Sequence, residues 1–92
     1  GELLEMLLAT LAHDRQGIQD ARANNARDSL LERVHRLHGA TRYCGVPQLR
    51  AACQHCETLL KRDSPASSAA LHDLDAAIEQ LLEATGQTSQ VL

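Results

Sequence analysis

Apolar residues recur every three or four positions along four successive segments of the chain, with polar residues between them. Because an α-helix turns by about 100° per residue, this spacing places the apolar side chains of each segment on one face. The pattern predicts helices at about residues 2–24, 26–43, 47–62 and 65–85, followed by a tail at 87–92. The expected buried positions are Leu4, Leu7, Leu8, Leu11 and Ile18 in the first helix, Leu30, Val34, Leu37, Thr41 and Cys44 in the second, Leu49, Ala52, Cys53, Cys56 and Leu60 in the third, and Leu71, Leu74, Ile78, Leu81 and Thr85 in the fourth.

Residues that end or begin helices stand between these segments. The Asn24-Asn25 dipeptide marks the first connection, since asparagine tolerates the left-handed conformation and also caps helices. Gly45 ends the second helix and Pro47 begins the third, while Ser64-Pro65 supplies an N-cap and a first-turn proline for the fourth. Short connections imply antiparallel neighbours. We therefore predict an all-α, up-down-up-down four-helix bundle that forms a single domain over residues 1–92.

Composition supports helices and excludes several functions. Tyr43 is the only aromatic residue, and leucine and alanine outnumber the β-branched residues that favour strands. The net charge is −3 with the two signs interspersed, and no block of lysine and arginine is present, so we expect no nucleic-acid partner. The apolar runs are too short for a membrane span, and no signal peptide opens the chain, so we expect no direct membrane contact. Three cysteines, an odd number, favour reduced thiols in the cytoplasm.

The second helix carries the candidate chemistry. His35 lies roughly 140° around the helix from the centre of the apolar stripe, which directs its imidazole toward solvent. A neutral imidazole is a good nucleophile near pH 7, because its ordinary pKa is about 6.5. Gly39, one turn later, costs the helix about 1 kcal/mol relative to alanine. We interpret Gly39 as removing a side chain that would crowd the ring, so that a large partner can reach it.

The segment His35-x-Leu37-His38-Gly39, followed by Gly45, resembles the His-x-Leu-Lys-Gly core of histidine phosphotransfer (HPt) domains. Its continuation through Tyr43-Cys44-Gly45-Val46-Pro47 is similar to the C-terminal HPt domains of BarA/GacS-type hybrid sensor histidine kinases of bacteria. This resemblance covers residues 30–60 well, whereas the first and fourth helices match only in pattern and length. It implies that His35 is the phosphoacceptor of a two-component phosphorelay.

The resemblance also implies supporting roles for nearby residues. The family usually has lysine where this chain has His38, so we expect weaker and more pH-dependent support of phosphohistidine than lysine would give. Arg42, one turn further along the same face, is a candidate for the missing fixed charge. Glu57 stands where the family often has glutamine or glutamate, and it would orient His35 or simply lie solvated on the flank of the third helix. Gly39 is the fourth residue, with His38, Arg42 and Glu57, to which the resemblance assigns a supporting role at the phosphoacceptor.

A docking surface and its partners follow from the same resemblance. Leu4, Leu8 and Leu31 lie at the edges of their stripes and form either ordinary core edge or an apolar patch for a receiver domain. Arg36 is a candidate for its polar rim, as are Arg42 and Arg50. The expected partners are the receiver domain of the chain's own hybrid kinase, which is expected to be anchored in the inner membrane, and that of a response regulator. We expect a monomer that is not a complete enzyme and has no cofactor of its own, with Mg²⁺ supplied by the receiver.

Other readings of the sequence remain open. The contrasting class is a non-catalytic helical interaction module in which His35 only decorates a binding face. A metal-dependent bundle enzyme has little support, because Glu32-x-x-His35 lacks a second copy of the motif. Cys53 and Cys56 have the spacing of a metal or redox motif, but both fall on the apolar stripe and are expected to pack in the core.

Overall fold

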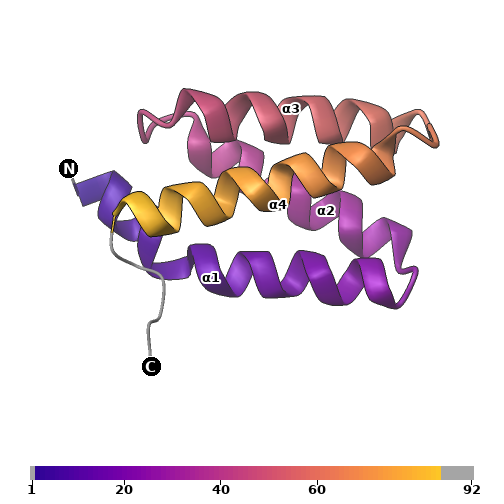
Figure 1. Ribbon diagram of the computed structural model, residues 1–92, viewed down its shortest axis with the longest axis horizontal. Coiled ribbons are helices and arrows are strands. Elements are labelled where there is room, and N and C mark those ends of the chain that lie inside the picture. The colour runs from indigo at the N-terminus through magenta and orange to yellow at the C-terminus, as the bar shows by residue number, and fades with distance from the viewer. Residues whose placement is uncertain (1, 86–92) are drawn as a thin grey trace.

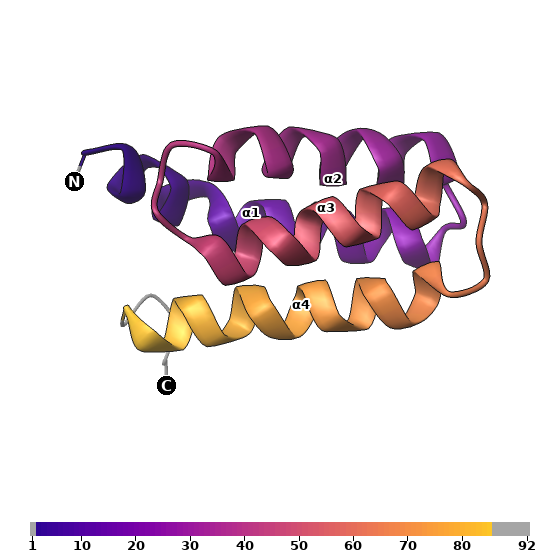
Figure 2. The same cartoon turned by 90° about the horizontal axis from the view of Figure 1, so that it is seen from above.

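Four helices follow one another in antiparallel order. The computed structural model describes residues 2–85, apart from the side chain of Leu3. The helices are α1 (Glu2–Ala23), α2 (Arg27–Thr41), α3 (Pro47–Lys61) and α4 (Ser67–Ala84). Consecutive helices run in opposite directions in both views, which confirms the expected up-down-up-down bundle (Figures 1 and 2). The expected stop at Gly86 and the tail at 87–92 lie outside the described residues.

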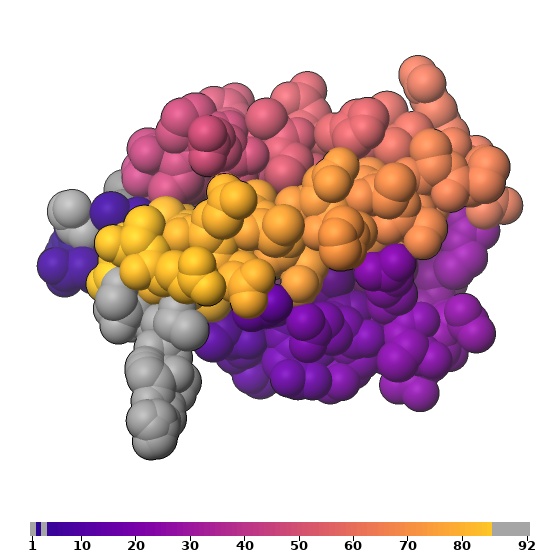
Figure 3. Space-filling model, in the orientation of Figure 1, coloured from indigo at the N-terminus to yellow at the C-terminus, as the bar shows by residue number. Residues whose placement is uncertain are grey.

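The helices close into a ring around one apolar core. Each helix packs against the next in sequence, and α4 also packs against α1. Figure 3 shows α4 filling the front face between α3 and α1. In this arrangement α2 packs against α1 and α3 and lies opposite α4. The seam between α2 and α3 is therefore formed by two helices alone, with the connection at residues 42–46 at one end.

The core confirms most of the expected buried positions and corrects the end of α4. Ile78 is buried as expected, but Leu82 is buried instead of Leu81, which is only partly covered, and Thr85 is exposed. Positions 81 and 82 both flank the stripe that starts at Leu71, so the packing of α4 between α3 and α1 decides which of them faces inward. The other expected positions that are only partly buried are Leu4, Leu8, Cys44 and Ala52.

Two helix boundaries differ from the prediction by two residues because turns replace terminal helical residues, whereas the others agree within one residue. The second helix ends at Thr41 and not near residue 43, and a turn then leads to Gly45, whose φ is +67°. Such a φ suits glycine because it has no Cβ. The fourth helix begins at Ser67 and not at residue 65. The Ser64 hydroxyl accepts a hydrogen bond from the amide of Ala66 (3.1 Å), so it stabilises the turn before the helix and is not its N-cap.

The asparagines of the first connection were expected to adopt the left-handed conformation and to cap the second helix, and only the first expectation is confirmed. Asn25 has a φ of 53°, which is the left-handed conformation anticipated for it. The N-cap position of α2 is Ala26, with no side-chain cap. Among the helices of residues 2–85, none combines the length and the apolar composition needed to cross a bilayer.

Candidate functional site

His35 projects outward from α2, as its place on the helix predicts. The buried residues of α2 are Leu30, Val34, Leu37 and Thr41, which direct the opposite face toward solvent. The His35 side chain is 67% exposed. Its ring is therefore accessible to a partner, and its packing contributes little to the core.

Glu57 anchors the His35 ring from the neighbouring helix. Its side chain is only 8% exposed, and its Oε2 lies 2.5 Å from Nδ1 of His35. The other carboxylate oxygen, Oε1, lies 2.9 Å from Nδ1 of His38, which is one turn further along α2. One buried carboxylate thus bridges two histidines across the α2–α3 seam. Glu57 is not a solvated flank residue, which was the alternative that the sequence left open.

Lys61 is the member of this network that the sequence analysis missed. Its Nζ lies 3.1 Å from Oε2 of Glu57, one helical turn before it in α3. The signal was present in the sequence, since a glutamate four residues before a lysine is a favourable pair on a helix surface. Lys61 is 59% exposed, so a fixed positive charge stands at the solvent edge of the site.

These contacts keep the Glu57 carboxyl ionised. Burial by itself raises its pKa, because the charged form loses hydration. Hydrogen bonds from His38, His35 and Lys61 outweigh burial and lower the pKa from 4.5 to about 2. An ionised carboxylate has no proton to donate, so both histidines must donate to it from Nδ1–H.

This proton arrangement defines the reactive atom of the site. With its proton on Nδ1, neutral His35 carries a lone pair on Nε2, the ring nitrogen that Glu57 does not engage. The carboxylate also stabilises the positive charge that the ring acquires when Nε2 forms a bond, as the carboxylate does in a serine-protease triad. The geometry therefore supplies an oriented nitrogen nucleophile on an exposed surface.

Gly39 leaves open space on the α2 surface. Apart from its chain neighbours and the nearby backbone of α2, a Cβ added there would meet no described atom within 4 Å, so it would not crowd the His35 ring. We expected that a side chain at position 39 would crowd the His35 ring. For a side chain as small as a methyl group, this expectation is wrong. The packing of the domain itself therefore gives no reason for glycine at this exposed position.

Arg42 and Arg50 lie further along the α2–α3 seam, beyond His38. Both line a hollow of about 260 Å³, together with Thr41 and Gln54. Within residues 2–85, no carboxylate pairs with either guanidinium. Arg36, in contrast, pairs with Glu32 at 3.2 Å. The structure places Arg42 outside the hydrogen-bonded network around Glu57, so the cation that contacts the network directly is Lys61.

The apolar residues proposed for docking are all partly covered. Leu4, Leu8 and Leu31 pack against the core while keeping part of their surface accessible. In the part of the chain that the structure describes, the exposed large hydrophobic residues are Met6 and Tyr43, neither of which was predicted from the sequence to belong to a docking surface. Docking by these residues stays a prediction.

The cysteine pair belongs to the core, as expected. Cys53 and Cys56 are fully buried. Burial is the main cause that raises the pKa of the Cys53 thiol to about 12 and that of the Cys56 thiol to about 11. Both therefore remain protonated thiols near neutral pH, whereas metal binding and redox exchange use the thiolate.

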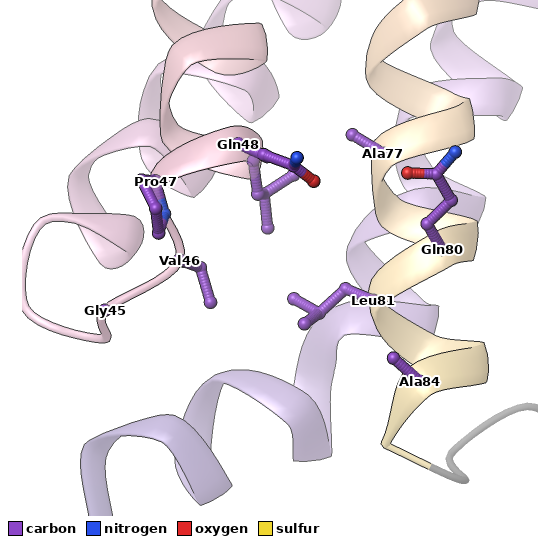
Figure 4. Close-up of a pocket in the computed structure, with 9 residues that line it drawn as sticks. Gly45, Val46, Pro47, Gln48, Ala77, Gln80, Leu81 and Ala84 are labelled. Carbon is purple, nitrogen blue, oxygen red and sulfur yellow. The ribbon is translucent and has the colours of Figure 1, made fainter.

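A second hollow, of about 510 Å³, has no histidine among its lining residues (Figure 4). It opens between the start of α3, near Val46 and Pro47, and the end of α4, near Leu81 and Ala84. None of its nine lining residues has a titratable side chain. It offers no nucleophile, acid or base, so it adds no candidate chemistry to that of the α2–α3 seam.

The bundle thus presents a histidine that is both exposed and oriented by a buried carboxylate. A family model described as the Hpt domain matches residues 2–84. The chain therefore belongs to the Hpt domain family, whose members are histidine phosphotransfer modules of two-component phosphorelays.

Relatives with curated names agree with this assignment. The chain is 61% identical over 80 residues to the sensor protein GacS of Pseudomonas syringae pv. syringae, and 30% identical over 82 residues to the histidine-protein kinase BarA of Shigella flexneri. These matches cover 87% and 89% of the chain but only 9% and 8% of the relatives, so the chain spans less than a tenth of their length.

A solved structure shows the same fold. The HPT domain of a sensor hybrid histidine kinase from Shewanella matches with a TM-score of 0.65 and 35% sequence identity. The match covers 97% of this chain and 81% of that one.

Proposed function

We propose that His35 accepts a phosphoryl group on Nε2 from an aspartyl phosphate of a receiver domain and then transfers it to a second receiver. The observation that carries this proposal is the exposed ring whose Nδ1–H is held by the ionised carboxylate of Glu57. An exposed histidine without such a partner populates both neutral tautomers. Here Glu57 favours the tautomer that leaves Nε2 free to react.

The transfer step uses the charges of the site in a defined way. The Nε2 lone pair forms a bond to phosphorus while the bond between phosphorus and the aspartyl oxygen breaks, and the aspartate leaves as a carboxylate. His35 keeps its Nδ1 proton, so the phosphorylated ring is cationic and its charge faces Glu57. Positioning and charge stabilisation supply most of phosphoryl-transfer catalysis, so little other chemistry is required of the domain.

The remaining catalytic parts are proposed to reside in the partner. Mg²⁺ and the acidic residues that hold it belong to the receiver, and the domain contributes no cofactor of its own. Glu57 is already engaged by three donors, which suits an orienting role better than that of a metal ligand. In this proposal the domain is a relay module and not a complete enzyme.

A receiver would dock on the surface around His35. Leu4, Leu8 and Leu31 would supply its apolar part, and Arg36 its polar rim. Arg42 and Arg50 would add unpaired positive charge along the same seam, suited to the acidic face of a receiver. The proposed partners are the receiver of the chain's own hybrid kinase and that of a response regulator. The domain would act as a monomer in the cytoplasm, as part of a kinase anchored in the inner membrane.

Labelling with a phosphorylated receiver tests the relay. In the presence of Mg²⁺, the domain should acquire phosphate that is labile in acid and stable in base. His35→Gln should abolish this label while leaving the domain folded, because the His35 side chain is largely exposed and Lys61 still contacts Oε2 of Glu57. His55→Gln, which alters an exposed histidine of α3, should label like the parent. No label on the parent would instead favour a non-catalytic interaction module.

A further inference from the structure

His38 is the residue at which this chain departs from the family motif, and its surroundings differ from those of His35. Its side chain is only 13% exposed, whereas that of His35 is 67% exposed. Its Nδ1 donates to Oε1 of Glu57 at 2.9 Å. The ring therefore lies within the α2–α3 seam, with its donor directed at the carboxylate.

The proton arrangement argues against a phosphate-binding role for neutral His38. Glu57 is ionised and only accepts hydrogen bonds, so the single proton of the neutral ring is on Nδ1. Its Nε2 then carries a lone pair, which repels the oxygens of a phosphoryl group. A lysine at this position would offer a cation and three donors. Neutral His38 offers neither a charge nor a second donor.

The fixed positive charge comes from the other helix. Lys61 contacts the same oxygen, Oε2, that accepts the hydrogen bond from His35. Among residues 2–85, Oε2 therefore has two partners, whereas Oε1 has His38 alone. Without His38, one oxygen of a buried carboxylate would lose its hydrogen bond, and the carboxylate could rotate away from the geometry that His35 requires.

We infer that His38 is a positioning residue that acts through Glu57, an inference that rests on the proposed phosphoacceptor role of His35. By holding Oε1, His38 keeps Oε2 directed at Nδ1 of His35. This contact keeps the exposed ring in the Nδ1–H tautomer, with Nε2 available for transfer. The charged and titratable groups that contact the carboxylate are His35 and His38 from α2 and Lys61 from α3.

Two substitutions separate this role from direct contact with phosphate. The amide nitrogen of asparagine takes nearly the place of histidine Nδ1, so His38→Asn keeps the donor to Glu57 but removes the far side of the ring. His38→Leu removes the donor and keeps apolar bulk. His38→Ala is a second donor-free variant, in case leucine disturbs the packing of the seam.

Phosphoramidate is a suitable donor for the rate measurement because it needs no docking surface. Its P–N bond breaks and ammonia leaves as phosphorus bonds to Nε2 of His35. We expect His38→Leu and His38→Ala to slow labelling about tenfold, the low end of the cost of removing a partner that orients a functional histidine. His38→Asn should stay within about threefold of the parent, since it retains the orienting hydrogen bond.

Ring ¹⁵N chemical shifts provide the second readout, because they distinguish protonated from unprotonated nitrogens. In the unphosphorylated protein, His35 should be mainly the Nδ1–H tautomer in the parent and in His38→Asn, and a mixture of tautomers in His38→Leu. The inference is overturned if His38→Asn is as slow as His38→Leu while His35 keeps its tautomer in both, since the ring itself would then matter. Parent-like rates and tautomers in the leucine and alanine variants would overturn it as well.

The proposed function fails by a different result. If the parent acquires no label on His35 from either donor, the relay is wrong. The ¹⁵N measurement still decides whether His38 positions His35, because it needs no phosphorylation.

Discussion

Two seams of the bundle each contain a carboxylate with a lowered pKa, yet they serve different purposes. At the α1–α4 seam, Asp75 accepts two hydrogen bonds from the guanidinium of Arg15, at 2.7 and 2.9 Å. Gln19 donates a third, at 3.0 Å. The hydrogen bond from Arg15 is the main cause that lowers the pKa of Asp75. Every group in this cluster is engaged by another, so the cluster joins two helices and leaves no reactive atom.

At the α2–α3 seam the carboxylate has partners of another kind. Glu57 receives hydrogen bonds from two histidines and a lysine, and one of these histidines is largely exposed. A guanidinium has only donors, whereas a neutral imidazole that donates from one nitrogen retains a lone pair on the other. A depressed carboxyl pKa therefore does not by itself identify a functional site. The exposed partner with an unused lone pair does.

Removing each carboxylate should give the sharpest contrast between the seams. Glu57→Ala is expected to slow labelling of His35 by a receiver about 100-fold, because the ring loses both its tautomer preference and the charge that stabilises the phosphorylated form. Asp75→Ala is the matched control from the other seam and should leave the rate unchanged while weakening α1–α4 packing. Equal rates for the two variants would contradict the functional distinction between the seams.

Acid should destabilise the protein mainly through the α2–α3 seam. The pKa of Glu57 is about 2 in the folded state and 4.5 without its partners, so its stabilising contribution is complete above about pH 5 and is lost as the pH falls toward 2. The loss is expected to be roughly 2–3 kcal/mol. Urea unfolding at a series of pH values measures it. Glu57→Gln should flatten the curve in this window, and a curve as steep as that of the parent would show that another group carries the acid sensitivity.

Two glycines within helices allow a test of docking at the α2 surface, with a smaller expected effect. Gly39→Ala should raise the free energy of unfolding by up to about 1 kcal/mol, since the helix gains propensity and the added Cβ meets open space. If glycine is there for a docking partner, labelling by a receiver should nevertheless slow, whereas labelling by phosphoramidate should not.

Gly17 on α1 provides the control for this test. A Cβ there would meet the guanidinium of Arg33, so Gly17→Ala should gain less stability and leave labelling by a receiver unchanged. If Gly39→Ala is labelled by a receiver as fast as the parent, the glycine has no docking role.

Local sequence accounts for much of the fold and for the orientation of the central residue. Leu30, Val34 and Leu37 define the inner face of α2, and because side chains of a helix have fixed angular positions, they also determine that His35 faces solvent. The boundaries were less predictable. Ser64 and Pro65 have the composition of a helix start, but the chain forms a turn there first, since such residues favour turns as well as caps.

The sequence by itself determined the four helices, their buried faces and the outward direction of His35, because helical periodicity depends only on neighbours within a few residues. Only the tertiary structure decided that Glu57 is buried, that it holds both His35 and His38, and that Lys61 shares its oxygen with His35. These contacts depend on how α3 is rotated and shifted against α2. Packing of the whole bundle sets that register, and the pattern of either helix alone does not contain it.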